Sequence, residues 1–147
     1  MFAWLELRTY CHATEDQEKV AKALGFICPR AKLTVTRAKG YNQNPIIVMI
    51  ARTDSKRAIR DFWDLMRREG LVDTVMASAS KMLDDNCVLH LRLGKQEAYA
   101  ERAVLTDRED VVSVQIKIAR HPPQRQDPLE SVRKSIGELM DPDVSHT

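Results

Sequence analysis

The chain has 147 residues, 44% of them hydrophobic and 30% charged, which suits one compact domain with an ordinary core. A net charge of only +2 excludes strong overall basicity, so affinity for nucleic acid would have to come from local clusters of cations. Three widely spaced cysteines indicate neither a disulfide framework nor a thiolate metal site, and no apolar run approaches the ~18 residues of a membrane span. We expect a soluble, cytoplasmic protein with no membrane partner.

The first element expected is a strand over residues 2–12, because apolar or small residues alternate there with charged and aromatic ones. Thr14 and Gln17 have the spacing of a capping box, which predicts a helix with Thr14 as its N-cap. Gly25 is the expected end of that helix. A strand followed by an amphipathic helix is therefore the predicted beginning of the domain.

Two further strands are predicted over residues 31–38 and 46–51, joined by a turn over residues 39–45. The second of these segments, IIVMIA, is apolar at every position. An uninterrupted apolar run of this length is typical of a strand covered on both faces, so we expect it to be central in the sheet.

The helix expected over residues 55–69 has the strongest amphipathic pattern in the chain, with Asp54 as the predicted N-cap. Its apolar residues recur at helical spacing and form one buried stripe. They are Ile59, Phe62, Trp63 and Met66. Its cations collect on the opposite arc, where Asp61 and Asp64 are the only acids. These cations are Lys56, Arg57, Arg60, Arg67 and Arg68.

Residues 71–83 form a second helical segment, which is expected to pack against the first after a break at Gly70. An alternating strand follows over residues 87–93, then one or two helical turns over residues 94–100. We expect a brief edge strand near residues 102–105.

The last strand is expected over residues 111–119, where every second residue is Val or Ile. Asp127 and Pro128 are the N-cap and first residue of a final helix that runs to about residue 140. The expected organisation is therefore a single domain over residues 1–140 with a flexible tail over residues 141–147.

This order of elements predicts an α+β fold, a two-layer sandwich in which helices cover one face of a mostly antiparallel sheet. The other face is expected to be polar, because its side chains alternate with those of the core. They are Arg8, Tyr10, His90, Arg92, Ser113, Gln115 and Lys117.

Such a face suits RNA, because cations meet phosphates, amides meet base edges and rings stack on bases. The alternative is that water simply covers it, as it covers one face of many antiparallel sheets. Lys95 and Gln96 follow Gly94 in a short polar loop near Arg92, and this loop could hold a phosphate. Ordinary loop polarity is the alternative there.

Catalysis is not indicated. Cys11 and His12 are adjacent in a strand and so lie on opposite faces, which prevents them from acting as a nucleophile and its base. The acidic residues at 84–85 and 107–110 lie in predicted turns, and the histidines have no ligand spacing. No Walker A, G-x-G-x-x-G or G-x-S-x-G motif is present. We therefore expect no enzyme, no cofactor and no metal.

Five collinear segments resemble one family, the archaeal proteins described as predicted RNA-binding exosome subunits. The segments are CHATEDQEKV, YNQNPIIV, RDFW, LRLGKQEAY and VVSVQIKI. The resemblance implies a fold similar to the large-subunit ribosomal protein that binds 5S rRNA, and a role linked to RNA processing or degradation. Two departures from the family pattern are Gly94, where an acidic residue is common, and Gln43, where a glycine is common.

The resulting hypothesis is a non-catalytic RNA-binding protein whose partner is structured or single-stranded RNA. The expected contacts are the helix cations Lys56, Arg57, Arg60, Arg67 and Arg68, with Arg8, Arg92, Lys95, Gln96 and Lys117 as a second surface. The rival hypothesis is an adaptor in which the same arginines meet acidic proteins of an exosome or a ribosome-assembly complex. The oligomeric state is left open.

Overall fold

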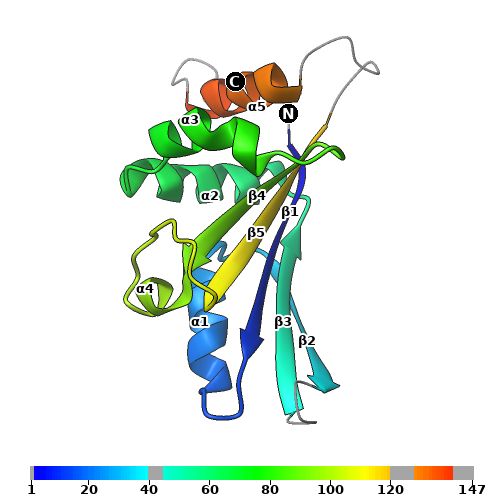
Figure 1. Cartoon of the computed structure of the whole chain (residues 1–147), viewed down its shortest axis with the longest axis vertical. Helices are drawn as coiled ribbons and strands as arrows, with labels where there is room; N and C mark the ends of the chain where they lie inside the picture. Colours follow the sequence, from blue (N-terminus) through cyan, green and yellow to red (C-terminus); the bar gives the residue numbers. More distant parts are fainter. Residues whose placement is uncertain (1, 40–44, 120–127, 141–147) are drawn as a thin grey trace.

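The structure, a computed structural model, describes residues 2–39, 45–119 and 128–140. Its sheet has five antiparallel strands in the order β2-β3-β1-β5-β4 (Figure 1). The strands are β1 (Phe2–Cys11), β2 (Lys32–Lys39), β3 (Pro45–Thr53), β4 (Val88–Gly94) and β5 (Val111–Ile118). The predicted α+β class and the mostly antiparallel sheet are confirmed.

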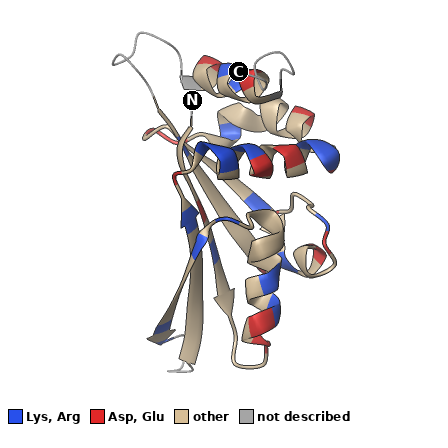
Figure 2. Cartoon of the chain, turned by 180° about the vertical axis from the view of Figure 1, so that it is seen from behind, with Lys and Arg blue, Asp and Glu red and all other residues tan. Residues whose placement is uncertain are grey.

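The helices form the second layer (Figures 1 and 2). They are α1 (Gln17–Ile27), α2 (Lys56–Arg68), α3 (Val72–Met82), the short α4 (Lys95–Tyr99) and α5 (Pro128–Met140). Helices α2, α3 and α5 contact one another near the N-terminal end of β1, whereas α1 and α4 pack together toward its other end. The opposite face of the sheet carries no helix among the described residues.

The strand β1 is the centre of the sheet, because it pairs with β3 on one side and β5 on the other. Its odd residues from Leu5 to Cys11 are buried, while Arg8 and Tyr10 are exposed, as the alternation predicted. The prediction that residues 46–51 would be central was wrong: β3 lies one strand from the edge. Its residues Ile46, Val48 and Ile50 are only half-buried, because they lie on the face of the sheet that no helix among the described residues covers.

Helix α2 buries its apolar stripe as predicted, and Phe62, Trp63 and Met66 are completely inaccessible. The Trp63 ring stacks on Phe2 of β1 with 5.5 Å between ring centroids, which joins the helix to the centre of the sheet. The predicted N-cap Asp54 was wrong. Ser55 is the N-cap, because its hydroxyl accepts a hydrogen bond from the Ala58 N–H at 3.2 Å.

Helix α1 begins and ends later than expected. Its N-cap is Asp16, whose carboxylate accepts from the Glu18 N–H, and not Thr14. The helix continues past Gly25 to Ile27, and Cys28 is its C-cap. A core contact explains this extension: Leu24 and Ile27 are buried, so the last turn packs although a glycine lies within it.

The break at Gly70 is confirmed, with a φ of +73° that suits glycine and turns the chain from α2 into α3. The brief strand expected near residues 102–105 is reduced to one isolated bridge between Leu93 and Leu105. The turn over residues 40–44, the cap at Asp127 and the tail over residues 141–147 lie outside the described residues. Within the described part of the chain, every helix is too short or too polar to cross a membrane.

Candidate nucleic-acid interface

The helix-free side of the sheet, called here the open face, brings together side chains from all five strands. The strand register aligns Lys32, Arg52, Glu6, Gln115 and His90 in one row across it. The next row consists of Thr34, Ile50, Arg8, Ser113 and Arg92. Five strand positions on this face are Lys or Arg, namely Arg8, Lys32, Arg52, Arg92 and Lys117. Glu6 is the single acid among the described strand positions there, so the face is strongly cationic.

Glu6 orders two of these arginines and does not neutralise the face. Its carboxylate lies 3.3 Å from the Arg52 guanidinium and 3.8 Å from that of Arg8, whose side chains are about half exposed. The Arg52 guanidinium also stacks over the Trp4 ring, 4.3 Å from the centroid. Both arginines therefore keep exposed faces while their orientation is restricted.

The cations on β4 and β5 are held mainly by carbonyl oxygens, which leaves their charge unneutralised. The Arg92 guanidinium donates to the Arg108 carbonyl at 2.6 Å, and the Lys117 ammonium donates to the Asn86 carbonyl. At the edge, the His90 ring lies 2.7 Å from the Asp84 carboxylate, and this hydrogen bond lowers the pKa of Asp84. The Arg92 and Lys117 side chains are therefore held in place without an ion pair that would neutralise their charge.

The five α2 cations predicted as the main contact surface lie on the helix layer, and acids interrupt them. Basic residues occupy both ends of α2 and acidic residues its middle (Figure 2). Asp64 pairs with Arg67 at 3.8 Å, and Asp61 pairs with Arg30 at 3.5 Å. Arg60 is half-buried, and its Nε has no hydrogen-bond partner among the described residues.

Within the described ranges, no ion pair involves the remaining α2 cations, Lys56, Arg57 and Arg68. They lie on the layer opposite the open face. The helix cations and the sheet cations are therefore two separate surfaces.

Lys95, which was expected at the second surface, is buried with an exposure of 1%. Its ammonium lies 2.9 Å from the Glu15 carboxylate and 2.7 Å from that of Asp110, and it donates to the Tyr10 carbonyl at 2.8 Å. All three donors of the ammonium thus have protein partners. Lys95 therefore has a structural role, because its buried ammonium connects α4 to β1 and to the start of β5.

Tyr99 and Gln96 extend this cluster. The Tyr99 hydroxyl donates to Glu15 at 2.7 Å, and the exposed Gln96 amide donates to Asp110 at 3.3 Å. Burial would raise the pKa values of the Glu15 and Asp110 carboxyls, but the hydrogen bonds they accept outweigh it and lower both. Burial and the Glu15 carboxylate raise the pKa of Tyr99. We call Glu15, Lys95, Tyr99 and Asp110 the lysine cluster.

Two carboxylates of the lysine cluster, together with His12 beside it, form the one candidate metal-binding group among the described residues. His12, Glu15 and Asp110 each offer a ligand atom within 4.8 Å of the others. The Lys95 ammonium already bridges the two carboxylates, so it occupies the position that a metal ion would need. All three cysteines are buried, and the Cys11 thiol lies beside the cluster, where it donates to the Glu15 carbonyl at 3.7 Å. Burial raises the pKa values of the Cys11 and Cys28 thiols.

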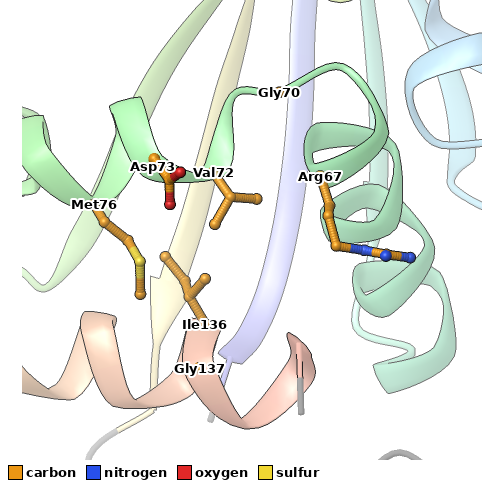
Figure 3. Close-up of a pocket in the computed structure, with 7 residues that line it drawn as sticks. All are labelled: Arg67, Gly70, Val72, Asp73, Met76, Ile136 and Gly137. Atoms are coloured by element: carbon orange, nitrogen blue, oxygen red, sulfur yellow. The ribbon is translucent and has the colours of Figure 1, made fainter. Parts of the chain in front are cut away.

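A hollow of about 330 Å³ lies between the helices α2, α3 and α5. Val72, Met76 and Ile136 line it together with one carboxylate, that of Asp73, while the Arg67 guanidinium extends away from them (Figure 3). A ligand site normally combines an apolar lining with convergent polar groups. The hollow in Figure 3 therefore offers little to orient a ligand.

Sequence reasoning missed Trp4, Lys32 and Arg52 on the open face, and Glu15 and Asp110 in the lysine cluster. Lys32 and Arg52 belong to the same alternation that identified Arg8, so extending it to the expected hairpin would have found them. Asp110 immediately precedes the strand β5, but nothing local links it to a lysine 15 positions earlier.

A family model described as RNA binding matches residues 4–118. The RNA-binding protein PAB1135 of Pyrococcus abyssi is 31% identical over 141 residues, covering 88% of this chain and 90% of that protein. The solved structure of a DUF54 protein from Methanothermobacter thermautotrophicus is 31% identical with a TM-score of 0.79, covering 92% of this chain and 98% of that one. A second solved structure, of the DUF54 protein AF2318 from Archaeoglobus fulgidus, is 26% identical with a TM-score of 0.79, covering 91% of this chain and 99% of that one.

Proposed function

The chain belongs to this archaeal family, described as RNA binding, and from that premise we propose that it binds RNA non-catalytically through the open face of its sheet. The observation that carries the proposal is the charge of that face, where five strand positions are Lys or Arg and one is Glu. Cationic side chains bind phosphate groups most strongly when they are exposed, held in place and not already neutralised by an acid.

The open face also supplies the other groups that RNA recognition uses. Tyr10 is 49% exposed on it, which offers a ring for base stacking. Ser113 and Gln115 lie between the cationic positions and offer hydroxyl and amide groups to sugars and base edges. The face thus combines electrostatic attraction with stacking and hydrogen-bonding groups.

The test is a titration of a labelled RNA at several salt concentrations between about 50 and 200 mM. Five phosphate contacts predict a slope of log affinity against log salt of roughly −3.5 for single strands. Replacing Arg8 and Arg92, which share one row, with Gln should weaken binding and make the slope less steep by about 1.4.

The matched control replaces two cations of the helix layer, Arg57 and Arg68, with Gln. The open-face proposal expects this pair to leave the slope nearly unchanged. Loss of affinity in the helix variant but not in the sheet variant would move the interface to α2, where it was first expected. A flat salt response in the unmodified protein would contradict electrostatic RNA binding altogether.

We further propose, from the resemblance to predicted exosome subunits, an accessory role in RNA processing or degradation. The experiment adds the protein to a purified archaeal exosome core that is degrading a labelled RNA. The proposal expects the degradation rate to change, and expects the Arg8→Gln and Arg92→Gln variant to lose the effect. An unchanged rate with the unmodified protein would contradict this role.

The adaptor function is supported by one specific observation. Leu33 and Val35 of the edge strand are 41% and 43% exposed, on the side of β2 that faces the helix layer. Exposed apolar side chains beside an unpaired strand edge suit a protein partner better than RNA. A partner that survives nuclease treatment and is lost with Leu33→Thr and Val35→Thr would favour the adaptor.

A further inference from the structure

A cavity of about 340 Å³ opens beside Tyr10, at the end of the open face where β1 finishes and β5 begins. Its lining is formed by Thr9, Tyr10, His12, Lys95, Glu109, Asp110 and Val111. The volume is at the small end of the range of about 300–1,000 Å³ for ligand pockets. It therefore suits a compact group, such as one nucleobase.

We propose that this cavity receives one unpaired guanine of a bound single-stranded RNA, stacked on Tyr10 with its Watson–Crick edge against the carboxylates of Asp110 and Glu109. The inference rests on the proposed RNA-binding function and gives it a base preference. Sequence-specific proteins read RNA chiefly through such exposed bases, by stacking and edge hydrogen bonds.

The Tyr10 ring projects from a fixed stretch of backbone. Its carbonyl accepts from the Lys95 ammonium at 2.8 Å, and the neighbouring Thr9 hydroxyl donates to the Val111 carbonyl at 2.9 Å. The ring is nevertheless 49% exposed. An aromatic side chain on a fixed backbone loses little entropy when a base stacks on it.

Apart from the exposed His12 imidazole, which lies 4.0 Å from the Glu15 carboxylate, the charged groups free to interact in the cavity are acceptors. The Lys95 ammonium is committed to Glu15, Asp110 and Tyr10. The Asp110 side chain is 47% exposed and ionised, because hydrogen bonds from Lys95 and Gln96 outweigh burial and lower its pKa. Glu109 is exposed and has no ion pair among the described residues. Carboxylates repel a phosphate and accept from N–H groups, so this end of the face favours a base over the RNA backbone.

Among the four bases, guanine fits two carboxylate oxygens best. Its N1–H and exocyclic amino group lie side by side and can donate to both oxygens together. Adenine, cytosine and uracil have only one donor group on this edge, so the second carboxylate oxygen would face an acceptor, whereas the O6 acceptor of guanine lies beyond its two adjacent donors. The cations of the open face are close to this site. Arg8 is two residues from Tyr10 on the same face, about 7 Å along the strand, so its guanidinium is within reach of a flanking phosphate.

The experiment measures fluorescence anisotropy of labelled uridine oligomers whose central residue is guanosine, adenosine, cytidine or inosine. Inosine keeps N1–H but lacks the exocyclic amino group. We expect the guanosine oligomer to bind about tenfold more tightly than the adenosine and cytidine oligomers, with inosine between them. Tyr10→Ala should weaken the guanosine oligomer about tenfold, whereas Tyr10→Phe should bind it normally.

A second variant pair tests the carboxylates. Glu109→Gln alone, and Glu109→Gln with Asp110→Asn, should progressively remove the guanosine preference while the salt slope remains. Circular dichroism confirms that the double variant is folded, because Asp110 also belongs to the lysine cluster.

The outcomes separate this inference from the function on which it rests. Salt-dependent binding with equal affinity for all oligomers and no effect of Tyr10→Ala would overturn the guanine site and leave RNA binding standing. Binding to duplex RNA alone would do the same. Failure to bind any RNA at low salt would overturn both.

Discussion

Replacing Lys95 with Met tests the lysine cluster most directly. The substitution keeps the unbranched stem of the side chain, one atom shorter, and removes the ammonium that lies 2.9 Å from Glu15 and 2.7 Å from Asp110. The two carboxylates would then face each other without a cation, and the Tyr10 carbonyl would lose its donor. Since these contacts join β1 and α4 to the segments that lead into α1 and β5, the expected result is a loss of global stability.

The magnitude follows from the burial of the partners. Removing one member of a fully buried ion pair costs about 3–5 kcal/mol. The Glu15 side chain is 18% exposed, but that of Asp110 is 47% exposed, so solvent relieves part of the penalty. We therefore expect the free energy of unfolding to fall by about 2–3 kcal/mol. For a domain of this size, that is a decrease in Tm of roughly 4–12 °C.

The pH dependence gives a sharper signature than the size of the loss. The folded-state pKa values of Glu15 and Asp110 are lowered, so their contribution to stability is present above the unfolded values and lost as the pH falls through the folded ones. The difference in free energy of unfolding between the unmodified protein and the Lys95→Met variant should therefore be largest above about pH 5 and should become smaller below about pH 4.

Urea denaturation followed by circular dichroism at pH 7, 5 and 3.5 measures this difference. Lys22→Met is the matched control, because Lys22 is exposed on α1 and should cost less than about 0.5 kcal/mol. A Lys95→Met protein as stable as this control, or a difference that is constant with pH, would refute the ion-pair explanation.

Three further substitutions have expected outcomes in the same denaturation assay. Ser55→Ala should cost about 1 kcal/mol by removing the cap of α2, whereas Ser80→Ala, on the exposed side of α3, should be nearly neutral; equal effects would contradict the cap. Gly70→Ala should cost about 1–2 kcal/mol because its φ is +73°, while Gly137→Ala, which meets open space inside α5, should stabilise slightly. Tyr99→Phe should cost about 1–2 kcal/mol and raise the pKa of the Glu15 carboxyl, measured by NMR titration; an unchanged pKa would argue against the hydrogen bond.

The strands of the sheet were predictable from sequence because successive side chains of a half-buried strand point alternately to the core and to solvent, so apolar and polar residues alternate. Leu5 and Leu7 in β1 and Val112 and Val114 in β5 are buried, with exposed or half-buried polar neighbours between them, as the period of two requires. The same logic failed for β3, where an apolar run indicated two covered faces. Its position beside the exposed edge strand depends on pairing between distant segments, which composition does not encode.

The helix caps and Lys95 show two other limits of sequence reasoning. Thr14 and Asp16 are both good capping residues two positions apart, and their competition is decided by where the buried face of α1 must lie. A lysine after a strand is expected at the surface, because lysine is rarely buried unless it is paired. Its partner Glu15 is 80 residues away in sequence, so the pairing becomes visible only when the fold brings them together.

The strand order also constrains synthesis. Of the five strands, the central one leaves the ribosome before the others, and one of its two neighbours, β5, begins only at Val111. Translation at about 5–20 residues per second takes roughly 3–12 s to pass from Thr53 to Val111. Throughout that interval, β1 exposes a bare hydrogen-bonding edge next to Leu5 and Leu7, so a nascent chain stalled before β5 should be aggregation-prone and a natural client for chaperones.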